Sequence, residues 1–210
     1  MIYWLYERRL LRELTTLPGT VCFMLSGTEV AAAPEKIFEC TTWCLEISEA
    51  VQTRALHGGA RGIDAITYHI STSSIGFVVP ILPILRRIAT IAHLVLHCGA
   101  QEEVAGEGIT VTIAIGKSGK EEIANAIRTM AEEAIPPDEV TEATLESHLT
   151  FRYAPDLVIK TGGDNLTDFL IWQSVYSELF FSEVNWALMR KIDLLRAFRD
   201  YQTRMRRFGK

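Results

Sequence analysis

The stretch Val21-Cys-Phe-Met-Leu25, followed at once by Ser26-Gly27, decides the fold. Five consecutive apolar residues that end at a small polar pair are typical of a buried parallel strand that runs into a loop. A helix is predicted after this loop, because Pro34 suits a first helical position and apolar residues then recur at three- and four-residue spacing. These residues are Ile37, Cys40, Cys44, Ile47 and Val51.

The same order of strand, polar loop and helix recurs along the chain. Further strands are predicted at 63–70, 109–115 and 156–159, with loops at 71–74, 116–119 and 161–165. This order predicts one α/β domain over residues 1–210, with a central, mostly parallel sheet covered by helices on both sides. Ligands of such sheets bind beyond the carboxyl ends of the strands, so the four loops should meet at one rim. They begin at Ser26, Ser71, Gly116 and Thr161.

The remaining apolar segments are interpreted as helices. They cover residues 2–14, 75–98, 169–179 and the chain from about 187 onward. The last helix should bury a stripe made of Leu188, Ile192, Leu195, Phe198, Tyr201 and Met205. The segment 75–98 is long enough to span a bilayer, but prolines, arginines and histidines interrupt it. We therefore expect a buried or membrane-touching helix there.

Composition and charge limit the classes of function. The chain has 210 residues, of which 48% are hydrophobic and 22% charged, as expected for a globular domain and not for a disordered chain. Its net charge is −5, but residues 190–210 carry 8 of the 21 Lys and Arg and 2 of the 26 Asp and Glu. The acidic remainder of the chain offers no basic surface for binding nucleic acid. The basic C-terminal segment suits phosphate, diphosphate or an anionic partner.

The cysteines and histidines give only weak signals. The four cysteines lie in apolar or helical contexts, which predicts free thiols in the cytoplasm. Cys40 and Cys44 share a helix face, but they lack a matching second pair, so packing is favoured over a metal site. His93 and His97 form an i,i+4 pair in the apolar segment without a third ligand, so we interpret them as core or lining residues.

Two glycine-containing loops are candidates for binding phosphate through backbone N–H groups. They read KSGK at 117–120 and TGG at 161–163. Neither matches a P-loop or a dinucleotide-binding motif, so ordinary turns before helices are the favoured interpretation. The residues alone thus indicate an anion-binding α/β domain of unassigned purpose.

More specific sequence motifs follow in the second half of the chain. They are DLVIKTGGD at 156–164, FLIWQ at 169–173, YSELF at 176–180, VNW at 184–186 and RRFG at 206–209. This ordered set resembles the C-terminal signature of cis-prenyltransferases, the undecaprenyl and dehydrodolichyl diphosphate synthases. The resemblance is nearly chain-wide but thin between 75 and 108. It implies a dimer that condenses isopentenyl diphosphate onto an allylic diphosphate with Mg²⁺, making polyprenyl diphosphate, the precursor of glycosyl carrier lipids.

Against that resemblance, several expected groups are missing. Ser26 stands where the family places the aspartate that holds Mg²⁺, and Glu29, three residues on, is interpreted as solvent-exposed. Lys160 occupies the position of one diphosphate-binding arginine of the family, and Asn165 occupies the position of the second. Thr167 retains the hydroxyl group of the family motif. Lysine lacks the planar fork of arginine, and asparagine lacks its charge. The chain is also shorter between 75 and 108, where the family builds much of its product tunnel.

Other family residues are retained, namely Glu178, Arg207 and Gly209. The resemblance implies that these elements are offered across the dimer interface, with Glu178 as a metal ligand shared between subunits. The Arg-x-Gly tail resembles the motif by which the noncatalytic, Nogo-B-receptor-like subunit of heteromeric synthases completes its partner's isopentenyl diphosphate site. Gly209 suits this role because its backbone can approach a phosphate closely.

The leading hypothesis from sequence is therefore a noncatalytic accessory subunit of a heteromeric cis-prenyltransferase. In it, Mg²⁺ would belong to the catalytic partner's site. The alternatives are a divergent homodimeric synthase and a module that binds a lipid carrier without chemistry. A cytoplasmic location is expected, with peripheral membrane contact through the N-terminal or the 75–98 segment left open.

Overall fold

A computed structural model describes residues 2–55, 61–72, 76, 78–99, 101–116, 118–149, 151, 154–162, 170 and 172–204. These residues form one seven-stranded sheet with the strand order β4-β3-β5-β2-β1-β6-β7. Every neighbouring pair is parallel except β3 and β4. The strands are β1 (Thr20–Ser26), β2 (Ala65–Ser71), β3 (His93–Cys98), β4 (Gln101–Ala105), β5 (Thr110–Gly116), β6 (Leu157–Thr161) and β7 (Glu178–Ser182). The predicted α/β domain with a mostly parallel sheet is confirmed.

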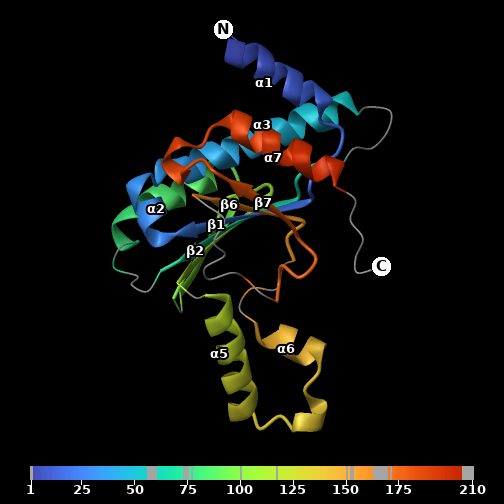
Figure 1. Ribbon diagram of the computed structural model, residues 1–210. Helices are drawn as coiled ribbons and strands as arrows, with labels where there is room; N and C mark the ends of the chain where they lie inside the picture. Colours follow the sequence, from blue (N-terminus) through green and yellow to red (C-terminus); the bar gives the residue numbers. More distant parts are fainter. Residues whose placement is uncertain are drawn as a thin grey trace.

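Helices cover one face of this sheet (Figure 1). The helix α3 (Glu35–Arg54) lies beside α7 (Lys191–Thr203), and α1 (Ile2–Glu13) packs outside them. The short α2 (Gly27–Ala32) follows β1 directly. Alternate residues of β1 point toward these helices, so that Phe23 stacks on Tyr68 and both rings contact the edge of Trp186. This aromatic cluster lies in the main core.

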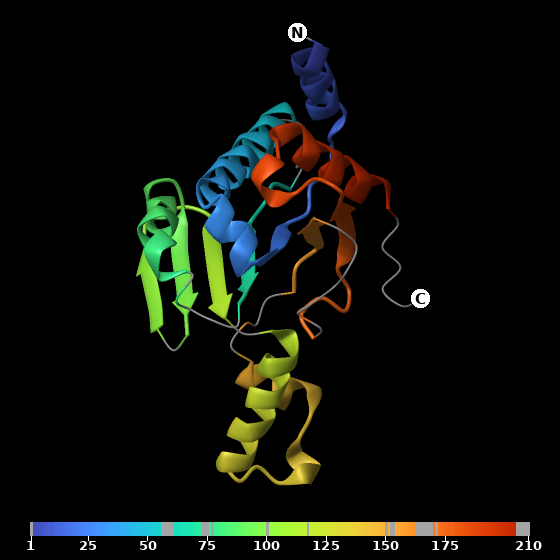
Figure 2. The same cartoon turned by 60° about the vertical axis from the view of Figure 1, so that its left-hand side comes forward.

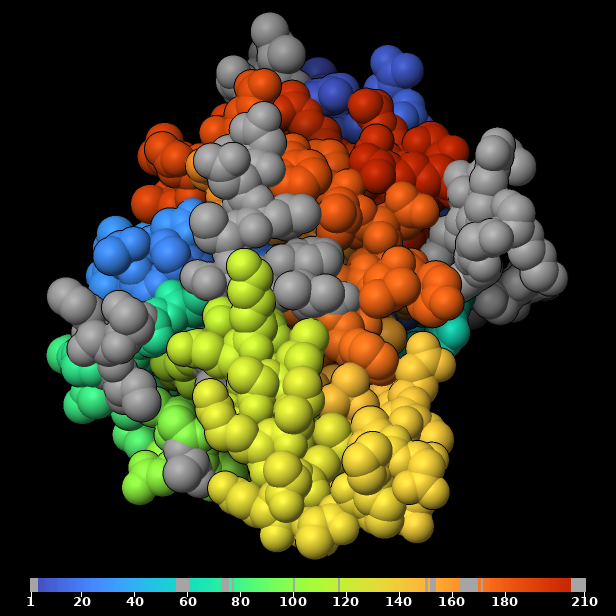
Figure 3. All heavy atoms as spheres, turned by 60° about the horizontal axis from the view of Figure 1, so that its bottom comes forward, coloured from blue at the N-terminus to red at the C-terminus, as the bar shows by residue number. Residues whose placement is uncertain are grey.

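The opposite face of the sheet is covered differently. Cys22, Met24 and Val158 point to this side and pack with Phe151 and Leu170 in a small second core. Helices α5 (Gly119–Glu132) and α6 (Glu142–His148) pack against each other (Figure 3) and extend past the carboxyl ends of the strands (Figure 2). The predicted sheet flanked by helices is confirmed, and on this second face the described residues that pack against the strands form the small second core.

The predicted helix over 75–98 was also wrong. Two 3₁₀ turns, η2 (Val79–Ile81) and η3 (Arg86–Thr90), flank the single turn α4 (Leu82–Leu85), and the strand β3 follows. Pro80 and Pro83 lack the backbone N–H that a continuous helix needs. In β3 the buried Leu94 and Leu96 alternate with more exposed residues, which is the period of a strand. No helix among the residues described here is long and apolar enough to cross a membrane.

The C-terminal elements differ from the prediction as well. Residues 172–176 form turns where a helix over 169–179 was predicted, and β7 begins at Glu178. A 3₁₀ turn, η5 (Trp186–Leu188), precedes α7, which starts four residues later than expected. Leu188 is 67% exposed and does not join the buried stripe of α7, and Met205 lies outside the described residues. The other four stripe residues are buried.

Gly106, just after the edge strand β4, has a positive φ of +81°. A Cβ atom there would overlap the carbonyl oxygen of Ala92 and lie 2.5 Å from that of Ala89. We expect Gly106→Ala to lower the free energy of unfolding by about 2–4 kcal/mol, since backbone strain and a backbone clash add up. Gly108 also has a positive φ, of +106°, but its nearest contact would be at 3.9 Å. In urea titrations Gly108→Ala should cost less, and equal losses would contradict the clash.

Candidate functional site

The carboxyl ends of the strands form the predicted rim. Ser26 pairs in register with Ser71, and Ser71 pairs in register with Gly116. Thr161 ends β6 on the other side of β1. Parallel pairing therefore places the polar ends of four strands in one row, as the sequence predicted.

Glu29 lies at the centre of this rim. Its Oε2 atom accepts hydrogen bonds from the backbone N–H of Ser26 at 2.8 Å and from the Ser26 hydroxyl at 2.7 Å. Its Oε1 atom accepts a hydrogen bond from the Thr161 hydroxyl at 3.1 Å. The Glu29 side chain is only 23% exposed, so the expectation of a solvent-exposed side chain was wrong.

A capping box explains why Glu29 turns inward. The Ser26 side chain accepts from the backbone N–H of Glu29, and the Glu29 carboxylate accepts from the backbone N–H of Ser26. The sequence Ser-x-x-Glu carries this signal. Sequence reasoning considered Glu29 only as a distant replacement for an aspartate. The structure brings the Glu29 carboxylate within hydrogen-bond distance of Ser26, so the two side chains belong to one hydrogen-bonded cluster.

Lys160 supplies the positive charge of the rim. Its Nζ atom donates to the carbonyl oxygen of Thr161 at 2.8 Å and lies 3.8 Å from Glu29 Oε2, and its side chain is 14% exposed. Gly162, with a φ of +72°, passes so close that a Cβ atom would lie 3.2 Å from Glu29 Oε1. The cluster thus combines a carboxylate, an ammonium group and a close backbone; the carboxylate suits a cation, and the ammonium group suits the oxygen atoms of a phosphate.

The donor atoms of this cluster fit Mg²⁺ when a diphosphate is bound with it. Mg²⁺ takes hard oxygen ligands and is commonly held by one or two carboxylates together with substrate phosphates. Glu29 supplies one carboxylate, and hydroxyl oxygens of Ser26, Thr28 and Thr161 lie around it. Within the described ranges no three His, Cys, Asp or Glu residues group as a metal site. Side chains alone therefore provide too few ligands.

Glu178 lies at the other end of the sheet. It begins β7 and pairs in register with Leu157, the first residue of β6, so it lies about 13 Å along the strands from Thr161. Its Oε2 atom accepts a hydrogen bond from Arg204 Nη1 at 3.2 Å, just beyond α7. Glu178 and the start of the basic tail are thus neighbours, and both lie away from the rim of their own chain. The candidate residues Asn165, Thr167, Arg207 and Gly209 lie outside the described residues.

Comparison with known proteins assigns the chain to a family. Residues 89–209 match the family model described as "Putative undecaprenyl diphosphate synthase". Isoprenyl transferase 1 of Corynebacterium efficiens is 34% identical over 250 aligned positions, which cover 100% of this chain and 98% of the relative. The chain belongs to the cis-prenyltransferase family. The alignment is 40 positions longer than the 210 residues of this chain, so the expected shortening is confirmed, while its location stays a prediction.

Other members of the cis-prenyltransferase family also align with nearly the whole chain. A protein of Thermobifida fusca named (2Z,6E)-farnesyl diphosphate synthase is 32% identical, with 99% of this chain and 97% of the relative covered. The crystal structure of lavandulyl diphosphate synthase from Lavandula x intermedia, in complex with dimethylallyl diphosphate, has a TM-score of 0.68 and 20% identity. It covers 92% of this chain and 99% of that chain, which shows the shared fold.

In this member of the cis-prenyltransferase family, the loop before α5 is an ordinary helix cap. Ser118 and Glu121 form a second capping box, and Glu122 adds another acidic residue to the first turn. These negatively charged side chains already occupy the N-terminus of α5 and would repel a phosphate there. This agrees with the interpretation of residues 117–120 as an ordinary turn before a helix. Lys117 lies outside the described residues.

The histidine pair does not lie on a helix. His93 and His97 both belong to β3, where they share a face but lie about 13 Å apart. His93 Nδ1 lies 3.1 Å from the carbonyl oxygen of Gly106, and His97 Nδ1 lies 3.3 Å from Glu102 Oε2. The i,i+4 spacing thus brings no two ligands together, and the interpretation as lining residues is retained.

The four cysteines are free thiols, and three are fully buried. Burial raises the pKa of Cys22 to about 12 and raises the pKa of Cys40 and Cys44 well above the ordinary value. Burial also shields these three thiols from reagents, whereas Cys98 is only partly buried, so we expect a thiol reagent such as DTNB at pH 8 to label only Cys98 in the native protein. All four should react in urea. Rapid native labelling of two or more thiols would contradict this packing.

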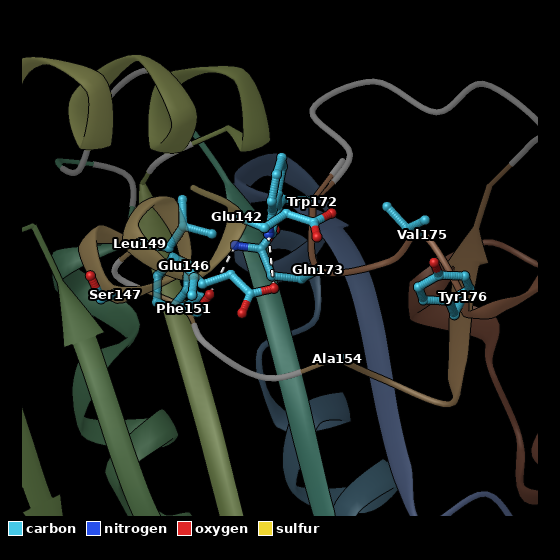
Figure 4. A pocket seen from close by; sticks show the side chains of 11 residues that line it. Glu142, Glu146, Ser147, Leu149, Phe151, Ala154, Trp172, Gln173, Val175 and Tyr176 are labelled. Carbon is cyan, nitrogen blue, oxygen red and sulfur yellow. Dashed lines mark hydrogen bonds between the residues drawn. The ribbon is translucent and has the colours of Figure 1, made fainter. Parts of the chain in front are cut away.

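A cavity of about 540 Å³ lies between α6 and the turns at 172–176 (Figure 4). Trp172 Nε1 donates to Glu146 Oε1 at 3.2 Å, and Gln173 Nε2 donates to the carbonyl oxygen of Phe151 at 2.9 Å. None of the rim residues lines this cavity. The candidate chemistry therefore lies at the rim and not in this cavity.

Proposed function

We propose that this chain is a catalytic cis-prenyltransferase that condenses isopentenyl diphosphate onto an allylic diphosphate as a homodimer. The observation that carries this proposal is the Glu29 carboxylate, which bonds to Ser26 at the rim. A carboxylate three residues along the chain reaches the place where the family aspartate would lie, because the capping box folds it back. Two relatives that cover nearly the whole chain carry the names of prenyl-transferring enzymes, which favours catalysis.

The rim residues suit the first half of this reaction. The allylic C–O bond breaks, diphosphate leaves, a C–C bond forms to isopentenyl diphosphate, and a proton is lost. Lys160 places an ammonium group beside the rim, where it would bind a diphosphate oxygen. Glu29, with the surrounding hydroxyl groups, would hold Mg²⁺ against the allylic diphosphate. When bound, the metal would neutralise charge that develops on the leaving group.

The second half of the site is proposed to come from the other subunit. Glu178 and the root of the tail lie together at the amino ends of the strands, so one chain does not bring them to its own rim. A second copy, turned to present that end, would add Glu178, Arg207 and Gly209 to the site. Asn165 and Thr167, after β6, would complete the diphosphate-binding loop of the first copy.

A noncatalytic accessory subunit is the second candidate, and one observation favours it. Glu29 is already engaged by Ser26, Thr161 and Lys160, and the nearby ammonium group competes with Mg²⁺ for the carboxylate. In that case the chain would serve a catalytic partner through Arg207 and Gly209 alone. The two candidates differ in whether the rim of this chain performs chemistry.

The deciding experiment measures prenyl elongation with radiolabelled isopentenyl diphosphate. This chain alone, a catalytic homologue whose own C-terminal Arg-x-Gly tail is inactivated but whose rim is intact, and the two co-expressed are compared, with Gly209→Ala of this chain in parallel. Activity of the chain alone supports the enzyme. Activity only in the mixture, lost with Gly209→Ala, refutes it and establishes the accessory subunit. Chromatography of the dephosphorylated products then gives the chain length.

A further inference from the structure

The exposed side of α1 carries two apolar residues at its leading end. Trp4 and Leu5 are 55% and 57% exposed, although both are large and apolar. The residues that hold α1 to the body, Leu10 and Leu14, are fully or almost fully buried on the other side. The outward apolar pair is therefore not needed for packing. Figures 1 and 2 both show the first turns of α1 projecting beyond α3 and α7.

The same exposed side is basic. Arg8 and Arg12 are exposed and follow Trp4 at four-residue steps, and the Arg8 guanidinium lies 4.3 Å from the centre of the Trp4 ring. Glu46 and Glu49 line the same shallow groove as these arginines, but within the described residues neither arginine forms an ion pair. The basic charge of this side is thus available to a partner.

The acidic residues of α1 are matched by cations of the protein itself. Glu7 lies 4.0 Å from the Lys191 ammonium, and Glu13 accepts from Arg9 at 2.8 Å and lies 3.9 Å from Arg199. The first turn of α1 contains no acidic residue. Because Glu7 and Glu13 are paired with cations of the protein, the surface around Trp4 and Leu5 is left positively charged.

We propose that this side of α1 is a peripheral membrane contact that binds an anionic lipid bilayer. An exposed Trp and Leu suit the boundary between headgroups and acyl chains, and arginines around them suit anionic headgroups. The projection of the helix lets the tip reach a flat surface before the body does. The contact does not depend on whether the rim catalyses prenyl transfer.

The test is sedimentation of the full chain with vesicles of phosphatidylglycerol and phosphatidylcholine, and with vesicles of phosphatidylcholine alone. We expect binding to the anionic vesicles that weakens as salt is raised. The variant Trp4→Ser/Leu5→Ser and the variant Arg8→Glu/Arg12→Glu should each lower the partition coefficient by about tenfold or more. Circular dichroism and thermal melting check that both variants fold.

A matched control lies on α5, where Ile127 is 54% exposed and precedes the exposed Arg128. Ile127→Ser/Arg128→Glu should leave vesicle binding unchanged. Equal loss in this variant, or no binding of the unmodified chain, overturns the proposal. Analytical ultracentrifugation without vesicles provides a further check. A shift to a smaller species caused by Trp4→Ser/Leu5→Ser would make the tip a protein contact and would also overturn it.

Discussion

Replacing Glu29 by glutamine is expected to lower kcat/KM for prenyl condensation by about 10²–10³-fold. Glutamine also satisfies a capping box, so α2 and the bond to Ser26 should persist. Only the negative charge is lost, together with the ability to hold Mg²⁺ against a diphosphate. The measurement is initial-rate kinetics at several Mg²⁺ concentrations, where the apparent affinity for Mg²⁺ should fall with the rate.

Glu121→Gln is the matched control for this substitution. Glu121 forms the second capping box, with Ser118, in front of α5. The control removes an equivalent charge away from the Glu29 cluster and should keep nearly full activity. Adding Ser26→Asp to Glu29→Gln should restore part of the rate, because a carboxylate then returns to the rim. Full activity of Glu29→Gln alone would remove the main support for a catalytic rim.

Trp186→Ala should give the largest loss of stability, about 3–5 kcal/mol in the free energy of unfolding. The Trp186 side chain is 1% exposed, contacts the rings of Phe23 and Tyr68, and donates from Nε1 to the carbonyl oxygen of Ala33 at 3.1 Å. Its removal leaves a cavity beneath α2 and an unsatisfied carbonyl at the end of that helix. Urea unfolding followed by circular dichroism measures the change.

Two variants make this measurement specific. Trp186→Phe keeps most of the ring volume but loses the hydrogen bond, so its loss should be intermediate. Leu188→Ala, two residues away and 67% exposed, should change stability by no more than about 0.5 kcal/mol. Equal losses for Trp186→Ala and Leu188→Ala would contradict the assignment of Trp186 to the aromatic core.

The central strands were predictable because burial on both faces leaves uninterrupted apolar runs. The run at Val21–Leu25 and the run of β5 gave both the parallel sheet and the rim. The strand β3 was missed because its composition suits a buried helix, and only its alternation distinguishes the two. The strand β4 is exposed along its whole length and leaves no apolar pattern.

The site was only partly predictable for a related reason. The rim followed from the order of strands and loops, but the inward turn of Glu29 depends on local hydrogen bonds at the start of α2. The capping-box spacing was present in the sequence, and a closer reading of it would have placed this carboxylate. The position of Glu178 depends on the register between β6 and β7, which no single segment encodes.

The separation of Glu178 from the rim has an evolutionary consequence. Because the two groups lie at opposite ends of β6 and β7, substitutions at one end leave the packing of the other end unchanged. After gene duplication, one copy can lose its rim residues while selection still preserves its Glu178 and tail. The architecture thus offers a short mutational route from two identical subunits to a pair with divided duties.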